Sequence, residues 1–86
     1  MYDILLKGLI EICFVTKDIL NKKIGQRIIH IRNQKGWSQS DLARACHKDR
    51  QAIEKIENGR VNPTLYSLFE IATALEISLS KLVDFS

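Results

Sequence analysis

Apolar residues between positions 38 and 59 recur at the spacing of two short amphipathic helices. Each of the two segments gathers its apolar residues on one side, at Leu42, Ala43 and Cys46 and then at Ala52, Ile53 and Ile56. Polar residues fill the opposite side of both segments. The pattern therefore predicts two helices that share one core and each have one solvent-exposed face.

Both predicted helices carry start and stop signals. Ser38 and Asp49 are N-cap residues, because their side-chain oxygens can accept a backbone N–H that the first turn leaves unpaired. Asp41 adds an acid to the first turn of the first helix, where the helix dipole favours it. Asn58 and Gly59 end the second helix, since glycine adopts the left-handed backbone easily. Two capped helices this close together indicate a helix-turn-helix, whose second helix enters the DNA major groove.

The solvent-exposed face of the second helix carries side chains that can contact the edges of DNA bases. Its polar residues are Arg50, Gln51, Glu54, Lys55 and Asn58. Arginine and lysine suit the acceptors of guanine, glutamine suits adenine, and glutamate accepts from cytosine. A solvated surface helix is the alternative for this helix taken alone. The turn before it and the basic residues around it favour DNA binding.

The rest of the chain after position 20 also predicts helices. Asn21 is expected to cap a helix that runs to about residue 35 and is closed by Gly36. Pro63 excludes helix at the residue before it, so a loop precedes a fourth helix capped by Thr64. Ser78 is expected to cap a short fifth helix. The expected fold is an all-α, compact five-helix domain over residues 21–86.

Residues 1–20 form an apolar extension of uncertain secondary structure. Ile4, Leu9 and Ile19 can share one side of a helix, but residues 9–16 are equally good strand material. A helix is favoured. The extension is too hydrophobic for a loose tail, so it is expected to pack on the domain, on a second subunit or on a protein partner.

Five short motifs occur in one order along the chain: IGQR at 24–27, KGWSQ at 35–39, IEKIENG at 53–59, NPT at 62–64 and ISLSKL at 77–82. In this order and spacing the chain resembles the phage repressor/Cro (Xre) family, over roughly residues 21–84. The resemblance implies a five-helix domain that binds double-stranded operator DNA, usually as a homodimer. One departure lies in the turn between the two helices, where the family usually has glycine followed by an apolar residue. Here the turn is His47-Lys48, and histidine tolerates the left-handed backbone at some cost.

Base and phosphate contacts follow from the exposed face and from the resemblance together. The expected base contacts are Arg50, Gln51, Lys55 and, against a thymine methyl group, Ala52. The expected phosphate contacts are Ser38, Gln39, Asn58, Arg60, Lys35 and Lys48. For Ala52 a place at the rim of the core is the alternative.

The resemblance also implies two structural roles. Arg32 and Glu57 are expected to form a salt bridge that holds the second helix of the motif in place, and Trp37 is expected to anchor the core. Dimer contacts are expected from the last helix, at Ile77, Leu79, Leu82, Val83 and Phe85. The alternative is that these apolar residues only close the core of the single chain.

Charge is distributed as a nucleic-acid binder requires. The net charge of the 86 residues is +3, and residues 21–86 hold 11 Lys and Arg against 7 Asp and Glu. Cys13 and Cys46 lack the spacing of a zinc site, and His30 and His47 have no acidic or cysteine cluster beside them. No metal, cofactor or catalytic centre is therefore expected. The apolar run at residues 9–15 lacks the basic leader of a signal peptide and is too short to span a membrane, so a cytoplasmic protein is expected.

Three classes of function agree with the sequence. The first is a sequence-specific transcriptional regulator, acting as a repressor that occupies a promoter. The second is the antitoxin of a toxin–antitoxin pair, with the apolar N-terminus bound to the toxin. The third is a protein-interaction module that has kept the fold without binding DNA.

Overall fold

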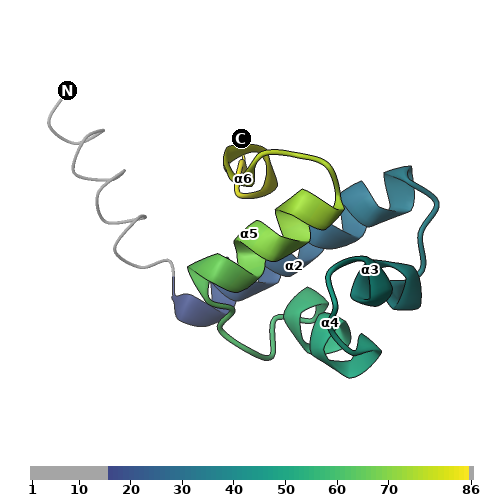
Figure 1. Ribbon diagram of the computed structural model, residues 1–86. Coiled ribbons are helices and arrows are strands. Elements are labelled where there is room, and N and C mark those ends of the chain that lie inside the picture. Colours follow the sequence, from purple (N-terminus) through teal and green to yellow (C-terminus); the bar gives the residue numbers. More distant parts are fainter. Residues whose placement is uncertain (1–15, 86) are drawn as a thin grey trace, which may run out of the picture.

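The computed structural model describes residues 16–85, and every regular element in that part of the chain is helical (Figure 1). The helices are α2 (Lys17–Gln34), α3 (Gln39–Ala45), α4 (Arg50–Glu57), α5 (Leu65–Ala74) and α6 (Leu79–Leu82). The all-α prediction is confirmed. The choice between helix and strand for residues 1–15 lies outside the described residues.

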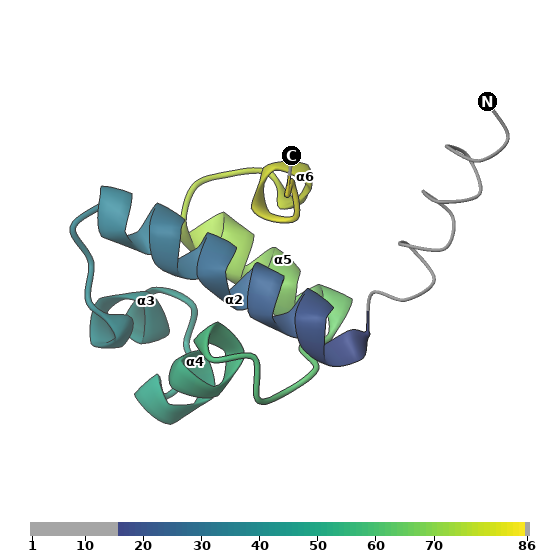
Figure 2. The same cartoon turned by 180° about the vertical axis from the view of Figure 1, so that it is seen from behind.

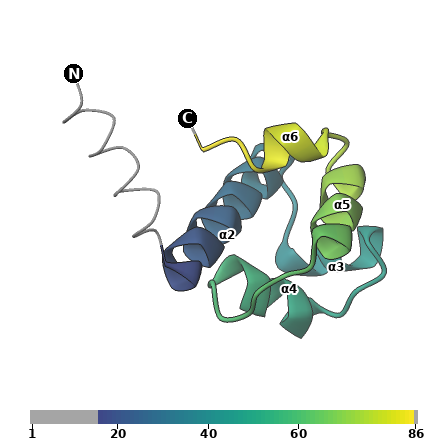
Figure 3. The ribbon, with the colours of Figure 1, turned by 90° about the vertical axis from the view of Figure 1, so that its left-hand side faces the viewer.

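The helices surround one core. The long helix α2 and helix α5 lie on opposite flanks, α6 crosses one end, and α3 and α4 form the other end (Figures 1 and 3). The view from behind shows α2 in front of α5 (Figure 2). Helix α6 contacts α5 and α2, whereas α4 contacts α2 and α3. The two helices of the motif are therefore presented at the end of the domain that faces away from α6.

The core is built from one apolar face of each helix. Its fully buried large side chains are Ile28, Leu42, Ile53, Ile71, Leu75 and Leu82. Each such side chain contributes about 1.5–3 kcal/mol through the apolar surface that it removes from water. A small domain has few of these side chains, so each helix depends on the others to remain folded.

Local capping chemistry fixes where four of the helices begin. The side chains of Ser38, Asp49, Thr64 and Ser78 each accept a hydrogen bond from the backbone N–H three residues later. These four predicted N-caps are confirmed.

The predicted start of the first described helix is wrong. Helix α2 begins at Lys17, with Thr16 as its N-cap and Asp18 in its first turn, while Asn21 is buried inside the helix. Thr16 offers a capping hydroxyl upstream, and nothing between the two positions stops the helix. The expected boundary between residues 20 and 21 thus falls within α2.

Helices α2 and α4 touch at a glycine. A Cβ atom added to Gly25 would lie 2.2 Å from the backbone oxygen of Glu57 and 2.7 Å from that of Ile56. Only a residue without a side chain permits this approach, so Gly25 sets the distance between the two helices.

Most apolar residues of the last helix complete the core of the single chain. Leu82 is fully buried, and Ile77, Leu79 and Val83 are partly buried against the core. Leu82, which was expected at a dimer contact, covers the core of the single chain beneath α6. Phe85 retains 42% of its surface in solvent.

The turn between α3 and α4 has the left-handed residue that its sequence predicts. His47 has a φ of 57°, and the next backbone N–H, that of Lys48, donates to the carbonyl of Ala43 at 2.9 Å. A side chain in this region of backbone space costs about 1 kcal/mol. The turn forms because the helix packing on both sides outweighs that cost.

Replacing His47 with glycine is expected to raise the melting temperature. Removing the left-handed strain is worth up to about 1 kcal/mol, and a domain of this size shifts by about 4–8 °C per kcal/mol. Thermal unfolding followed by circular dichroism measures the effect. Ala45→Gly is the matched control. It introduces glycine at a right-handed helical position and should lower the melting temperature. An unchanged or lower value for His47→Gly would contradict the role of the turn.

Candidate nucleic-acid interface

Helix α4 has one buried and one exposed face, as its sequence requires. Ile53 and Ile56 enter the core, whereas Arg50, Gln51 and Lys55 are exposed. Ala52 is partly buried, and with Gln51 and Lys55 it lines a shallow groove between α4 and the loop that leads to α5. The structure thus brings the four expected base-contact residues together on one helix.

Most expected phosphate contacts lie at the two ends of this surface. Ser38 and Gln39 stand at the start of α3, and Asn58 and Arg60 follow the end of α4. Ser38, Asn58 and Arg60 are exposed, and Gln39 is partly buried.

The two lysines among the expected phosphate contacts lie beside acidic side chains of the protein. The Lys48 ammonium lies 3.0 Å from a carboxylate oxygen of Glu70. The Lys35 ammonium lies 5.0 Å from the centre of the Trp37 ring and 3.7 Å from a carboxylate oxygen of Glu76. Lys48 nevertheless lines the groove beside α4 together with Gln51 and Lys55. The phosphate contacts of both lysines stay a prediction.

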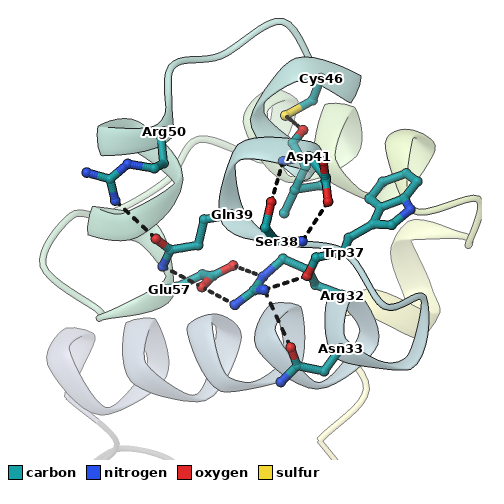
Figure 4. A network of polar contacts seen from close by, with 10 residues as sticks. Arg32, Asn33, Trp37, Ser38, Gln39, Asp41, Cys46, Arg50 and Glu57 are labelled. Atoms are coloured by element: carbon teal, nitrogen blue, oxygen red, sulfur yellow. Dashed lines mark hydrogen bonds and ion pairs between the residues drawn. The ribbon is translucent and has the colours of Figure 1, made fainter.

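A buried ion pair joins α2 to the end of α4 (Figure 4). The Arg32 guanidinium donates from Nε and Nη2 to the two carboxylate oxygens of Glu57, at 2.8 and 3.0 Å. Its Nη1 donates to the Trp37 carbonyl at 2.7 Å. The Glu57 side chain is only 1% exposed, so its buried charge is stabilised by this bidentate contact with Arg32.

Gln39 links that ion pair to the exposed face of α4. Its amide nitrogen donates to Glu57 Oε1 at 3.0 Å, and its amide oxygen accepts from Arg50 Nη1 at 3.3 Å (Figure 4). The orientation is fixed chemically, because a carboxylate can only accept and a guanidinium can only donate. Sequence reasoning missed this link, since partners 18 and 11 residues away leave no local signal.

Glu54 lies between the two arginines that flank the surface. Its carboxylate oxygens are 3.7 Å from Arg50 Nη1 and 3.9 Å from Arg60 Nη1. Exposed pairs of this length contribute at most about 1 kcal/mol. Both guanidiniums can therefore exchange Glu54 for a stronger acceptor, such as a phosphate or a guanine edge, at little cost.

The start of α3 is closed by a reciprocal capping box. The Asp41 backbone N–H donates to the Ser38 hydroxyl at 3.1 Å, and the Ser38 backbone N–H donates to the Asp41 carboxylate at 2.9 Å. The hydrogen bond from the Ser38 backbone, then the Ser38 side chain and the nearby Arg44 guanidinium, lower the pKa of Asp41. The carboxylate is thereby kept ionised, and the first turn of α3 stays fixed.

Cys46 is a buried core residue, as its place on the apolar face predicts. Burial raises the pKa of its thiol, which donates to the Leu42 carbonyl at 3.1 Å. Within residues 16–85 no group of three or more His, Cys, Asp or Glu side chains could hold a metal ion. None of the described helices is long and apolar enough to cross a membrane.

The comparisons with known proteins agree with this geometry. Residues 28–82 match the family HTH_3, described as helix-turn-helix. The chain belongs to this family. The resemblance to repressor/Cro-like proteins is thus confirmed.

Proteins similar to this chain include a transcriptional regulator, an antitoxin and a controller protein. The uncharacterized HTH-type transcriptional regulator y4dJ of Sinorhizobium fredii is 33% identical over 64 residues, which cover 74% of this chain and 83% of that protein. Antitoxin HipB of Escherichia coli is 38% identical over 50 residues, which cover 58% of this chain and 57% of HipB. The structure of the restriction-modification controller protein C.AhdI from Aeromonas hydrophila matches with a TM-score of 0.70 and 37% identity, over 72% of this chain and 94% of that one.

The capping box should make stability depend on pH. Because the folded pKa of Asp41 is depressed, its contribution is present above the ordinary carboxyl range near about pH 4 and is lost as pH falls through the folded value. Asp41→Asn should therefore lower the melting temperature at neutral pH. The difference from the unmodified chain should shrink as the pH is lowered below that range. A difference that stays constant with pH would show that the carboxylate charge is not what stabilises the turn.

Proposed function

We propose that this protein is a sequence-specific, double-stranded DNA-binding transcriptional regulator that places α4 in the major groove. The observation that carries the proposal is the exposed face of α4. It offers Arg50, Gln51 and Lys55 on a helix whose other face is locked into the core. An α-helix fits the width of the major groove, and these side chains match the groove's donor and acceptor pattern.

Each side chain has a distinct part in this proposal. Gln51 can pair with adenine through its amide, and Arg50 and Lys55 can reach guanine. Ala52, at the edge of the shallow groove, suits the methyl group of thymine. Glu54 releases Arg50 as the guanidinium enters the groove.

Phosphate contacts at both ends would fix the position of α4 without selecting a sequence. Ser38 and Gln39 serve one end, and Asn58 and Arg60 serve the other. Contacts to the backbone position a domain, whereas contacts to base edges specify the site. Two similar proteins, y4dJ and C.AhdI, are named as a transcriptional regulator and a controller protein, which supports this reading.

The proposed regulator acts as a homodimer on two half-sites about 34 Å apart, as helix-turn-helix dimers do. Bound at a promoter, such a dimer excludes other proteins from the same DNA, so repression is the proposed effect. In a bacterial cell this activity belongs to the cytoplasm, where the chromosome lies. The proposal assigns no catalytic role and no cofactor.

An antitoxin is the second candidate, favoured by the similarity to HipB. In this case the domain would bind DNA and the apolar residues before α2 would bind the toxin. Expressing the neighbouring gene alone and together with this chain distinguishes the two candidates by its effect on cell growth. For an antitoxin, that gene's product arrests growth when expressed alone and is neutralised by this chain. For a simple regulator, co-expression changes nothing.

Two variants should separate base reading from phosphate contact. Gln51→Ala should weaken binding to the operator by about 1–3 kcal/mol and leave random DNA unaffected, because it removes one base contact. Arg60→Ala should weaken both DNAs and reduce the salt slope by about one, because it removes one phosphate contact. Fluorescence anisotropy on the gene's own upstream DNA and on random DNA, across a salt series, measures both effects.

A matched control removes a positive charge far from α4. Lys81 is exposed on α6, at the opposite end of the domain, so Lys81→Ala should change neither affinity nor slope by a comparable amount. Equal losses on operator and random DNA for both test variants would refute the assignment of roles. An unmodified chain with no preference for its upstream DNA would refute autoregulation.

A further inference from the structure

The outer face of α5 carries an exposed apolar patch. Leu65 and Tyr66 are each 70% exposed and Phe69 is 54% exposed, at positions that lie within one turn of each other. The opposite face of α5 is buried in the core through Leu68 and Ile71. Contiguous apolar patches on a small domain mark interaction surfaces, whereas single exposed apolar residues do not.

A hollow lies beside the two aromatic side chains. It has a volume of about 400 Å³. Its apolar lining is Tyr66, Phe69, Ala45, Cys46 and Ala74, and its polar lining is His47, Glu70 and Thr73. The same face therefore has both exposed aromatic rings and a shallow cavity with a mixed, partly apolar lining. A symmetric dimer needs such a self-complementary surface, because each copy presents the same residues to the other.

Charge also favours a second copy on this face. Glu70 is the one charged residue between Thr64 and Leu75, and it is paired with Lys48 at 3.0 Å. Two copies can thus meet through α5 without unpaired like charges. The exposed side of α2 differs, because Lys22 and Lys23 would repel the same residues of a second copy.

The arrangement of the helices is compatible with a dimer contact through α5. Helix α6 and the α3–α4 pair lie at opposite ends of the domain, with α5 on a flank between them (Figures 1 and 3). A two-fold axis beside α5, parallel to the direction from α6 to α4, leaves both α4 helices at the same end.

From these observations we infer that a second copy of this chain binds the α5 patch of Leu65, Tyr66 and Phe69. The aromatic side chains of each copy pack over the hollow of the other, and the last helix is left to close the core. The inference rests on the proposed function only in requiring both α4 helices to face one duplex. It replaces the expected dimer contact at the last helix.

Glutamate substitutions in the full chain test this interface. Tyr66→Glu and Phe69→Glu should each weaken the dimer by at least about thirtyfold, the effect of losing a central aromatic contact. Sedimentation equilibrium without DNA measures the dissociation constant. Because both positions are exposed, the circular dichroism spectrum should remain that of the folded chain. Phe85→Glu, at an exposed aromatic residue beyond α6, is the matched control and should leave the dimer unchanged.

The other outcomes overturn the inference. A dimer that survives both α5 variants, or that is lost in Phe85→Glu, places the contact elsewhere. An unmodified chain that stays monomeric at its highest soluble concentration, with and without operator DNA, removes the dimer altogether. Binding to upstream DNA is measured separately. If the unmodified chain fails to bind DNA but its dimer is sensitive to Tyr66→Glu, the proposed function fails and the interface stands.

Discussion

The buried carboxylate of Glu57 is the point on which the rest of the structure depends. It stands at the last residue of α4, and its side chain is 1% exposed. A lone charge at this depth would be strongly destabilising, so Arg32 must contact it with both prongs of its guanidinium. The backbone carbonyl of Glu57 lies against Gly25, which precedes Arg32 by two turns on α2. Helix α4 is thereby fixed to α2 by both its backbone and its side chain.

From Glu57 the polar contacts lead outward to the exposed face of α4. Gln39 bonds Glu57 on one side and Arg50 on the other, so the starts of α3 and α4 are joined through one amide. The exposed side chains of α4 consequently project from a rigid base. Such preorganisation matters for base reading, because a bidentate contact loses its selectivity when the helix that presents it can shift.

Sequence reasoning succeeded where the determinants are local. Ser38, Asp49, Thr64 and Ser78 were predictable as caps because a cap acts within one turn, and the left-handed backbone of His47 follows from a short turn without glycine. It failed at Asn21, because Thr16 offers an equally good cap upstream and apolar spacing alone does not choose between them.

What sequence reasoning could not supply are the contacts between distant segments. Whether Leu82 closes the core or meets a partner depends on how α2, α5 and α6 converge, which no local pattern encodes. The exposure of Tyr66 and Phe69 also depends on this packing, because the same residues could equally have been buried. The ion pair of Lys48 with Glu70 likewise joins residues 22 positions apart, so no local pattern indicates it. The Gln39 link could be found only with α3 and α4 in place.

The most direct test of this account is a double-mutant cycle on the ion pair, with the free energy of unfolding measured by urea denaturation. Arg32→Met and Glu57→Leu should each destabilise the domain by about 3–5 kcal/mol, because each leaves one charge buried without its partner. The double variant should recover most of that loss, since no uncompensated charge remains. Additive losses, with the double variant less stable than either single variant, would show that the two residues act independently. The pair would then not be what holds α4 in place.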